Sequence, residues 1–395
     1  MTEHLKRRIR LGLLTAYGVG VMVGAGIYVL VGAVAGEAGI WAPVAFLLAG
    51  VIAAPTALSY SEFSTRIPEA AGEAAYVGKG LNSQALAVFV GLAIVAAGTI
   101  SAAAVLRGGV GYLTVVVDVP FGWSVSAVGA ALVAVAIVGV MESLSLAAVF
   151  TVVELIGLAL VIWAGTNASV SPDWSAMPAP VWVGVGAGAV LAFFAFIGFE
   201  DIVNMAEEVE NPERTMPRAI LISLVLTTLI YALVTWATVR AVPLSLLSGS
   251  EKPLALVWQA GVGGDGRFLS SIAVFAALNG VLAQIVMASR VLYGLGKRSP
   301  ALSVFHHANA RTGTPILASL LIGALVIGAA LMLDVELLAE ATSSILLGVF
   351  VIVNLALILL KRREPDAPFK VPMAVPVVGL VLALAALLFN LGVGP

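Results

Sequence analysis

Long apolar runs recur along the whole 395-residue chain and are separated by short polar segments. A helix of about 20 apolar residues crosses the roughly 30 Å hydrocarbon core of a bilayer, so each run predicts one spanning helix. Strands of a membrane barrel would alternate apolar and polar residues, whereas these runs are apolar on all sides. The pattern predicts an all-α integral membrane protein with eleven spans. The expected spans are 12–36, 41–63, 84–110, 123–141, 146–166, 181–203, 217–241, 268–294, 314–333, 337–360 and 372–392.

Composition agrees with this pattern and excludes several classes of protein. Hydrophobic residues make up 61% of the chain and charged residues 11%, far from the values of soluble domains. The chain has no cysteine, which excludes disulfides, a disulfide-linked partner and thiolate metal sites. Its net charge of −2 gives no reason to expect nucleic acid binding. Because we find no metal-ligand spacing, phosphate-binding loop or catalytic grouping, we expect neither an enzyme nor a cofactor.

Basic residues predict the orientation in the membrane. The basic start of the chain followed by an apolar run also resembles a secretory signal, but the run is too long and further spans follow. Sixteen of the twenty lysines and arginines fall on the side of the first residue, so we expect a cytoplasmic N-terminus. Eleven spans then place the C-terminus outside. The segment 242–267 on the outer side is partly apolar and predicts a short surface helix.

Two spans contain residues that interrupt a helix. In GVGVMVGAGIYVLVG (18–32), Gly24 and Gly26 let the chain unwind, which exposes N–H groups and a positive helix end to a carboxylate. The second segment, near Phe194–Gly198, would offer free carbonyls to an ammonium group. Together they would hold a zwitterion. Close packing of small residues is the alternative explanation for the glycines.

Five spans separate the two irregular segments, and an odd number of crossings inverts the second half relative to the first. If 181–360 repeats 12–166 upside down, the two interruptions meet near the midplane of one transporter domain, and 372–392 is an extra helix. This expectation depends on spacing alone.

Several motifs resemble the amino acid, polyamine and organocation (APC) family of secondary transporters, near its bacterial permeases of the cationic amino acid transporter type. The matching stretches are GVGVMVGAGIYVLVG, YSEFSTRIPEAAGEAAYVGKGL, FFAFIGFEDIVNMAEEVENPERTMPRAI, ASRVLYGLGKRS and KRREPDAPFKVP. The resemblance implies a leucine-transporter-like fold of two inverted five-helix repeats plus one helix. It also implies amino acid transport across the cytoplasmic membrane of a bacterium, with membrane lipid around the protein.

The resemblance also implies a substrate site built largely from backbone groups. The amides around Val23, Gly24, Ala25 and Gly26, next to Ile27, would bind the substrate carboxylate. The carbonyls of Phe194, Ala195 and Ile197, before Gly198, would bind its amine. Either Phe194 or Phe196 would be an aromatic gate or would simply pack in the core.

Glu154 is the deepest ionisable side chain, about 10 Å into the fifth span. Such groups usually face a cavity, a proton relay or a partner. Proton-coupled relatives often carry a lysine there, so this chain departs from the family pattern. We expect a proton carrier first, a helix-bracing donor second and a sodium ligand with Ser289 third.

Other polar residues in the spans have two interpretations. Glu200 would either gate the site and balance charge or cap the helix that restarts after the second break. Asn279, Gln284 and Asn354 are typical of hydrogen bonds between membrane helices.

The sequence therefore predicts a secondary active transporter that works by alternating access, is coupled to H⁺ with Na⁺ as the alternative, and carries a neutral amino acid. Alternatives are an amino acid exchanger, a cationic amino acid or polyamine transporter, and a channel or nutrient receptor with the same fold.

Overall fold

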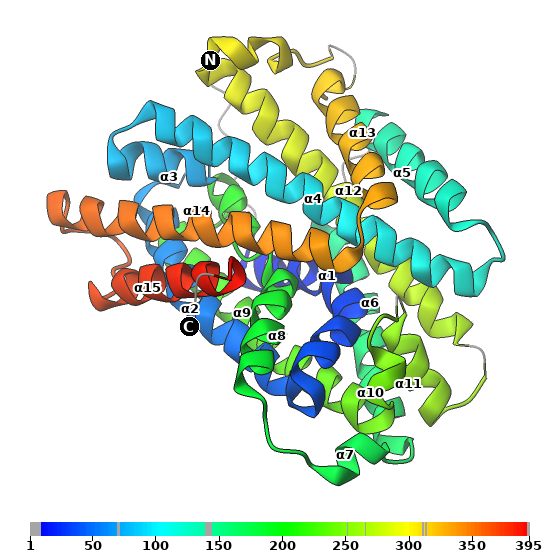
Figure 1. The fold of residues 1–395 in the computed structure, drawn as a ribbon. Coiled ribbons are helices and arrows are strands. Elements are labelled where there is room, and N and C mark those ends of the chain that lie inside the picture. Colours follow the sequence, from blue (N-terminus) through cyan, green and yellow to red (C-terminus); the bar gives the residue numbers. More distant parts are fainter. Residues whose placement is uncertain are drawn as a thin grey trace.

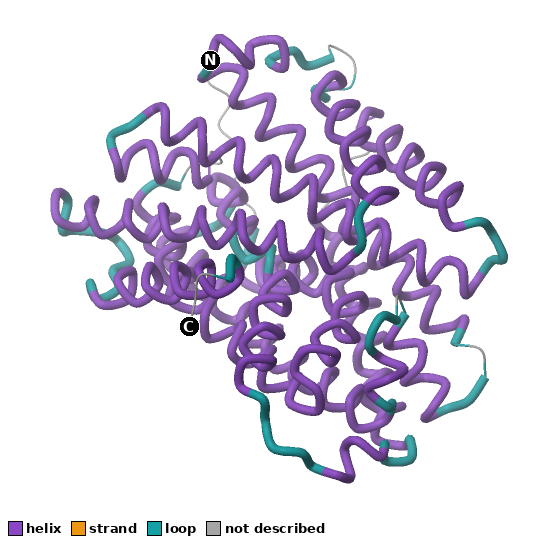
Figure 2. The backbone as a smooth tube through the Cα atoms, in the orientation of Figure 1, coloured by secondary structure: helices purple, strands orange, loops and turns teal. Residues whose placement is uncertain are grey.

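The computed structural model describes residues 9–68, 72–138, 144–250, 252–264, 266–309, 312 and 314–392, without the side chains of residues 25, 144–147, 204, 207 and 297. In this part of the chain the backbone is helical almost throughout and the loops are short (Figure 2). The prediction of an all-α membrane protein is confirmed. The basic residues Lys6, Arg7, Arg8 and Arg311, used to predict orientation, lie outside the described residues.

The helices follow the predicted apolar runs closely. In chain order they are α1 (Leu11–Ala38), η1 (Gly39–Trp41), α2 (Ala42–Arg66), α3 (Gly72–Leu81), α4 (Gln84–Val116), α5 (Phe121–Val138), α6 (Leu144–Asn167), α7 (Pro172–Ala176), α8 (Trp182–Phe193), η2 (Phe194–Phe196), η3 (Asp201–Glu208), α9 (Pro212–Ala241), α10 (Leu244–Leu247), α11 (Pro253–Gly261), α12 (Arg267–Arg298), η4 (Pro300–Phe305), α13 (Ile316–Met332), α14 (Val335–Arg363) and α15 (Ala374–Asn390).

Every predicted span is occupied by an apolar helix. Eight helices of the described residues are long and apolar enough to cross a membrane, and three further apolar helices are shorter. One of the eight, Gly26–Arg66, covers the second half of the first predicted span together with the second. The surface helix expected in 242–267 is present as α10 and α11, which lie with α7 at one end of the molecule (Figure 1). The short helix α3 was not predicted.

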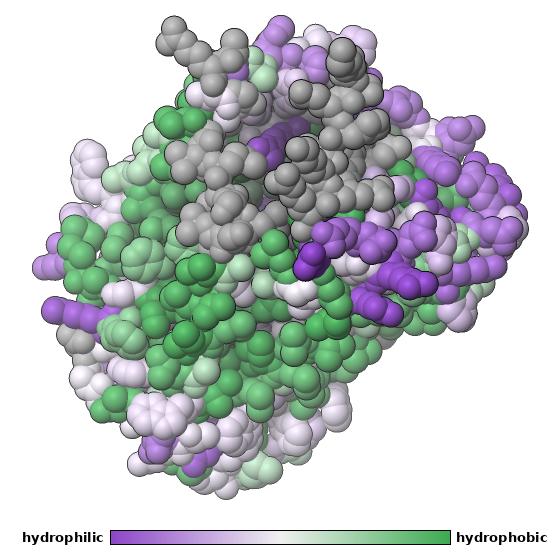
Figure 3. Space-filling model, turned by 180° about the vertical axis from the view of Figure 1, so that it is seen from behind, coloured by the Kyte–Doolittle hydropathy of each residue, from purple (hydrophilic) through white to green (hydrophobic). Residues whose placement is uncertain are grey.

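Four of the five pairs of helices that lie five spans apart pack side by side, whereas the fifth pair, α6 with α14, makes no comparable contact among the described residues. Counting the apolar helices in order, the first contacts the sixth (α1 with α8), and α2 contacts α9. Likewise α4 contacts α12, and α5 contacts α13 (Figure 1). Large apolar side chains such as Val51 and Leu229 are more than half exposed, and such residues form a broad hydrophobic area on the face drawn in Figure 3. A surface of this kind suits lipid rather than water.

A buried ion-pair cluster holds one end of α2 and α14 together. The Glu62 carboxylate accepts hydrogen bonds from Arg66 and from Lys361 Nζ, each at 2.6 Å, and from the backbone N–H of Val371 at 2.9 Å. Glu62 is fully buried, so these donors replace the water that its charge loses. Further along the same two helices, the Asn354 carboxamide of α14 bonds to the hydroxyls of Thr56 and Ser59 of α2. This confirms the interhelical role predicted for Asn354.

Candidate functional site

The first predicted break lies within α1. Gly24 has φ −7° and ψ −159°, so the helix is interrupted there and the two halves are Leu11–Gly24 and Gly26–Ala38. Nothing lies within 4 Å of the position that a Cβ on Gly24 would take. At Gly26 an added Cβ would lie 3.0 Å from the Cα of Ala195. Because neither glycine has a side chain, open space remains beside Gly24, and Gly26 lies in close contact with the second break.

The second break follows α8. After the single turn of η2, Ile197 adopts ψ 131° and Gly198 has φ +122°, a conformation that strongly favours glycine. A Cβ on Gly198 would lie 2.6 Å from Cγ1 of Val21 and 3.1 Å from its carbonyl carbon. The chain then resumes as the 3₁₀-helix η3. The two breaks are therefore in direct contact, which only the small residues Gly26 and Gly198 permit.

Tyr231 of α9 ties the two breaks together. Its hydroxyl lies 2.5 Å from the carbonyl oxygen of Met22 and 2.8 Å from that of Ala195, so it can donate to either. The Tyr231 ring is fully buried and contacts Phe196 and Phe46 edge to face. A carbonyl freed from helical bonding is costly to bury without a donor. Tyr231 supplies one such donor, which the carbonyls of the two interrupted helices share.

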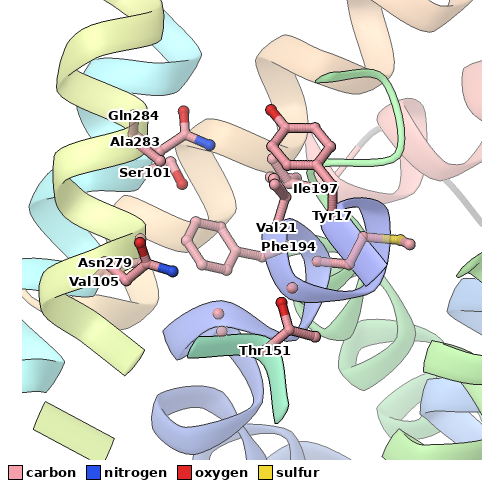
Figure 4. Close-up of a pocket in the computed structure, with 15 residues that line it drawn as sticks. Tyr17, Val21, Ser101, Val105, Thr151, Phe194, Ile197, Asn279, Ala283 and Gln284 are labelled. Atoms are coloured by element: carbon pink, nitrogen blue, oxygen red, sulfur yellow. The ribbon is translucent and has the colours of Figure 1, made fainter. Parts of the chain in front are cut away.

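A cavity of about 90 Å³ lies beside the breaks. One wall consists of the interrupted part of α1 with Phe194 and Ile197. The other wall carries Ser101 of α4 with Asn279 and Gln284 of α12, and Thr151 of α6 closes one end (Figure 4). The Tyr17 hydroxyl adds a further polar group. Among the described residues, no carboxylate lines this cavity.

A second cavity of about 10 Å³ continues beyond the first and shares Ile197 and Gln284 with it. Its lining includes the carboxyl groups of Glu200 and Asp201. Glu200 Oε2 accepts a hydrogen bond of 3.0 Å from the backbone N–H of Gly198. The carboxylate thus pairs with a backbone N–H at the break itself. Glu200 stands at the N-cap position of η3, but its side chain makes no capping hydrogen bond to that helix.

The predicted substrate residues divide into two groups. Gly24, Gly26, Phe194 and Ile197 line the larger cavity. The residues that do not line it are Val23, Ile27, Ala195, Phe196 and Gly198. The side chain of Ala25 lies outside the described part. Of the two candidate gate aromatics, Phe194 faces the cavity, whereas Phe196 packs on Tyr231.

The carbonyls expected to bind the amine are already partly engaged. Ala195 O accepts from Tyr231, and Phe194 O accepts from the N–H of Ile197 at 3.2 Å. A carbonyl has two lone pairs, so both retain capacity for a second donor.

Glu154 and Ser289 lie outside both cavities. Glu154 is 1% exposed and its backbone carbonyl accepts a 3.0 Å hydrogen bond from Tyr28. Thr151, three residues earlier on the same helix face, does line the larger cavity and donates to Ala16 O of α1. Glu154 is therefore one turn from the cavity. The Ser289 hydroxyl donates to Val286 O within its own helix.

Several lining residues carried no clear signal in the sequence. Tyr17, Ser101 and Thr151 are common residue types in membrane helices, and Tyr231 acquires its role only through packing. Asn279 and Gln284 were predicted to bond across helices. Neither has a hydrogen bond to another described residue, and both line the cavity instead.

Hydrogen bonds anchor the chain on both sides of the break in α1. On one side the Tyr112 hydroxyl donates to Tyr28 O at 2.6 Å and accepts from the N–H of Leu254 in α11 at 3.3 Å. On the other side Ile9 pairs with the segment after η3, donating to Glu208 O at 3.0 Å and accepting from Glu210 N at 2.9 Å. Each interrupted helix is thus anchored beyond the cavity.

Glu73 of α3 lies buried near the carboxyl group of Asp201. Burial raises its pKa to about 7, and the negative charge of Asp201 contributes in the same direction. Glu73 belongs to the short helix after α2 rather than to a membrane span. This carboxyl therefore binds a proton far more readily than an exposed one.

The chain was compared with known proteins. The family model described as "Amino acid permease" matches residues 11–395. A vacuolar cationic amino acid transporter 4 of Arabidopsis thaliana is 29% identical, over 92% of this chain and 65% of that protein. The branched-chain amino acid permease BcaP of Bacillus subtilis is 26% identical, over 99% of this chain and 89% of that protein. Cationic amino acid transporter 4 of Homo sapiens is 31% identical, over 93% of this chain and 62% of that protein.

The chain thus spans less than two thirds of the length of the plant transporters that it matches. Each of these relatives is named as a transporter or permease, which agrees with the expectation that the chain is not an enzyme.

Replacing Tyr231 by phenylalanine tests the link between the breaks. Tyr231→Phe keeps the ring but removes the one hydroxyl of the described residues that reaches Met22 O and Ala195 O. Leaving buried carbonyls without a donor costs about 1–3 kcal/mol. We expect a lower unfolding temperature and faster amide hydrogen exchange at both breaks. Tyr293→Phe is the control, because no described residue bonds to that hydroxyl. Equal effects of the two variants would show that Tyr231 does not hold the breaks.

Stability should depend on pH through Glu73. Its pKa is about 7 in the folded protein, against 4.5 as the ordinary value. Between these values the unfolded chain releases this proton while the folded chain keeps it, so stability falls as pH rises, by about 3 kcal/mol in all.

Unfolding temperatures of the wild type and Glu73→Gln should therefore diverge from pH 4.5 to 7 and run parallel above that range. Glu213→Gln, an exposed change, should leave the wild-type curve as it is. A constant difference across the whole pH range would refute the raised pKa.

Proposed function

Since this chain belongs to the amino acid permease family, we propose that it is a secondary active transporter that carries a neutral amino acid across a membrane by alternating access. The observation that carries this proposal is the meeting of two interrupted helices beside a cavity with a polar opposite wall. Membrane transporters place such breaks at the substrate site, where freed backbone groups line a cavity.

The pairing of helices five spans apart supports the inverted repeat. A pseudo-two-fold axis that relates 12–166 to 181–360 would bring equivalent helices together in pairs, as α1 with α8, α2 with α9, α4 with α12 and α5 with α13. The two breaks then belong to equivalent helices. We infer one transporter domain in which α15 is the additional helix.

The charge of the cavity supports a neutral substrate. An α-carboxylate and α-ammonium group would bind to the backbone of the two breaks, at Gly24 and Gly26 and at Ile197. A cationic side chain would need a carboxylate, and the described part of the chain brings none to the lining of the larger cavity. The relatives named for cationic and branched-chain amino acids differ in substrate among themselves, so their names do not decide the question.

We place the protein in a bacterial cytoplasmic membrane with its N-terminus inside. The distribution of lysine and arginine supports this orientation, and the permease of Bacillus subtilis covers nearly the same length.

Counterflow in proteoliposomes tests transport. Vesicles loaded with an unlabelled neutral amino acid should transiently accumulate the labelled one from outside. A channel would let label equilibrate without accumulation, and a receptor would take up none. Gly26→Val should abolish counterflow, because its Cβ would lie 3.0 Å from the Cα of Ala195. Gly12→Val is the matched control, since nothing lies within 4 Å of its added Cβ.

We further propose that Glu154 carries the coupling proton. It is buried one turn from the cavity-lining Thr151 and close to the break in α1 through Tyr28. A carboxyl in this position can exchange its proton as the neighbouring helices separate.

Glu154→Gln should therefore abolish accumulation driven by a pH gradient and preserve counterflow. Glu213→Gln, exposed in the first turn of α9, should alter neither assay. Accumulation that persists in Glu154→Gln would remove Glu154 from coupling, and uptake that needs internal amino acid and ignores the pH gradient would indicate an exchanger.

A further inference from the structure

The carboxamide of Gln284 lies at the junction of the two cavities. Gln284 is 8% exposed, and its Oε1 is buried without a hydrogen bond to any described residue. A Cβ on Gly98 would lie 3.1 Å from this oxygen, so the side chain occupies space that only glycine leaves at that position. A buried acceptor without a donor destabilises a protein. A buried polar side chain that destabilises the protein in this way needs a role other than packing.

Two further polar side chains lie on the same wall, and one of them, Asn279, is only partly buried. The Ser101 hydroxyl and the Asn279 carboxamide also line the larger cavity, and neither bonds to another described residue. Gly280 and Ala283 are small and leave room in front of them. Figure 4 shows these polar side chains on α4 and α12, across the cavity from Phe194 and the break in α1. One wall is therefore largely backbone and the other is hydroxyl and carboxamide.

This division orients an amino acid. If its carboxylate and ammonium groups bind to the backbone wall, its side chain extends towards Ser101, Asn279 and Gln284. Carboxamides and hydroxyls both donate and accept hydrogen bonds. The Gln284 carboxamide can present either its oxygen or its NH₂, because its last torsion is soft. Such a wall complements a side chain that also donates and accepts.

We propose that Gln284, with Ser101 and Asn279, selects a small neutral amino acid whose side chain bears a hydroxyl or carboxamide. The inference rests on the proposed function, namely that this cavity binds amino acids. An aliphatic side chain would leave the buried Gln284 oxygen, and the two polar side chains that line the cavity beside it, without a hydrogen-bond partner from the ligand. A cationic one would have to pass Gln284 to reach Glu200 and Asp201, and the cavity there, about 10 Å³, has room for about one water.

Threonine and valine test the inference, because they have nearly the same shape and differ by one hydroxyl. Binding to the purified protein is measured by calorimetry, with lysine as the cationic probe. The wild type should bind threonine at least about tenfold more tightly than valine. Gln284→Met keeps the length of the side chain and removes its polar atoms, so it should bring the threonine-to-valine ratio close to one by weakening threonine.

Gln259→Met, on the exposed face of α11, is the matched control and should keep the wild-type ratio. Ser101→Ala is the second variant and should lower the ratio even if Gln284→Met does not fold.

Tighter binding of valine or lysine than of threonine would overturn the inference while leaving amino acid transport intact. So would an unchanged ratio in folded Gln284→Met or Ser101→Ala. If none of the three amino acids binds to the wild type and counterflow is also absent, the proposed function fails and the inference with it.

Discussion

The structure depends on satisfying backbone groups where two membrane helices stop being helical. In hydrocarbon an unpaired N–H or C=O costs several kcal/mol, so an interruption persists only where protein atoms or a cavity replace the lost bonds. Here the Tyr231 hydroxyl reaches a carbonyl of each break, and Glu200 accepts from Gly198 N. The glycines at 26 and 198 bring the two chains into contact, and the groups left over face a cavity of about 90 Å³.

The same requirement links the cavity to both ends of the molecule. The half of α1 beyond the break is bonded through Tyr28 to α6 and Tyr112, and Tyr112 bonds in turn to Leu254 of the surface helix α11. The other half follows directly after Ile9 and Arg10, and Ile9 pairs with Glu208 and Glu210 at the end of η3 and just after it. A solute that altered the hydrogen bonds at either break would therefore act on a helix that is bonded on both sides of its break to other segments, which is the kind of coupling that the proposed alternating access needs.

Sequence reasoning predicted the elements of this site better than the contacts between them. The lengths of the apolar runs predicted an apolar helix in each of the eleven expected segments. The glycines, with the aromatic residues around the second segment, predicted both breaks. Both predictions depend on local properties of the sequence. The Tyr231 bond could not be predicted, since it depends on how α9 packs against two distant segments. The sequence predicts a hydrogen bond between helices for both Asn354 and Gln284, because most carboxamides in membrane helices find such a partner. Asn354 makes this bond, whereas the Gln284 oxygen has no partner among the described residues. The difference depends on how the helices pack and not on the residue type.

The buried carboxyl groups are of two kinds: Glu62 is paired with cationic side chains, whereas others lie at or near a cavity. Glu62 is surrounded by Arg66, Lys361 and a backbone N–H, so its charge is balanced without any ligand and α2 is fastened to α14. Glu200 and Asp201 border a small cavity, and Glu154 lies one turn from the larger one. On the proposed function, a carboxyl next to a cavity that opens and closes would experience a changing dielectric, and this would change its affinity for a proton. The fully paired cluster therefore suits a rigid frame, and we propose that the carboxyls beside the cavities are the ones that movement of the interrupted helices charges and discharges.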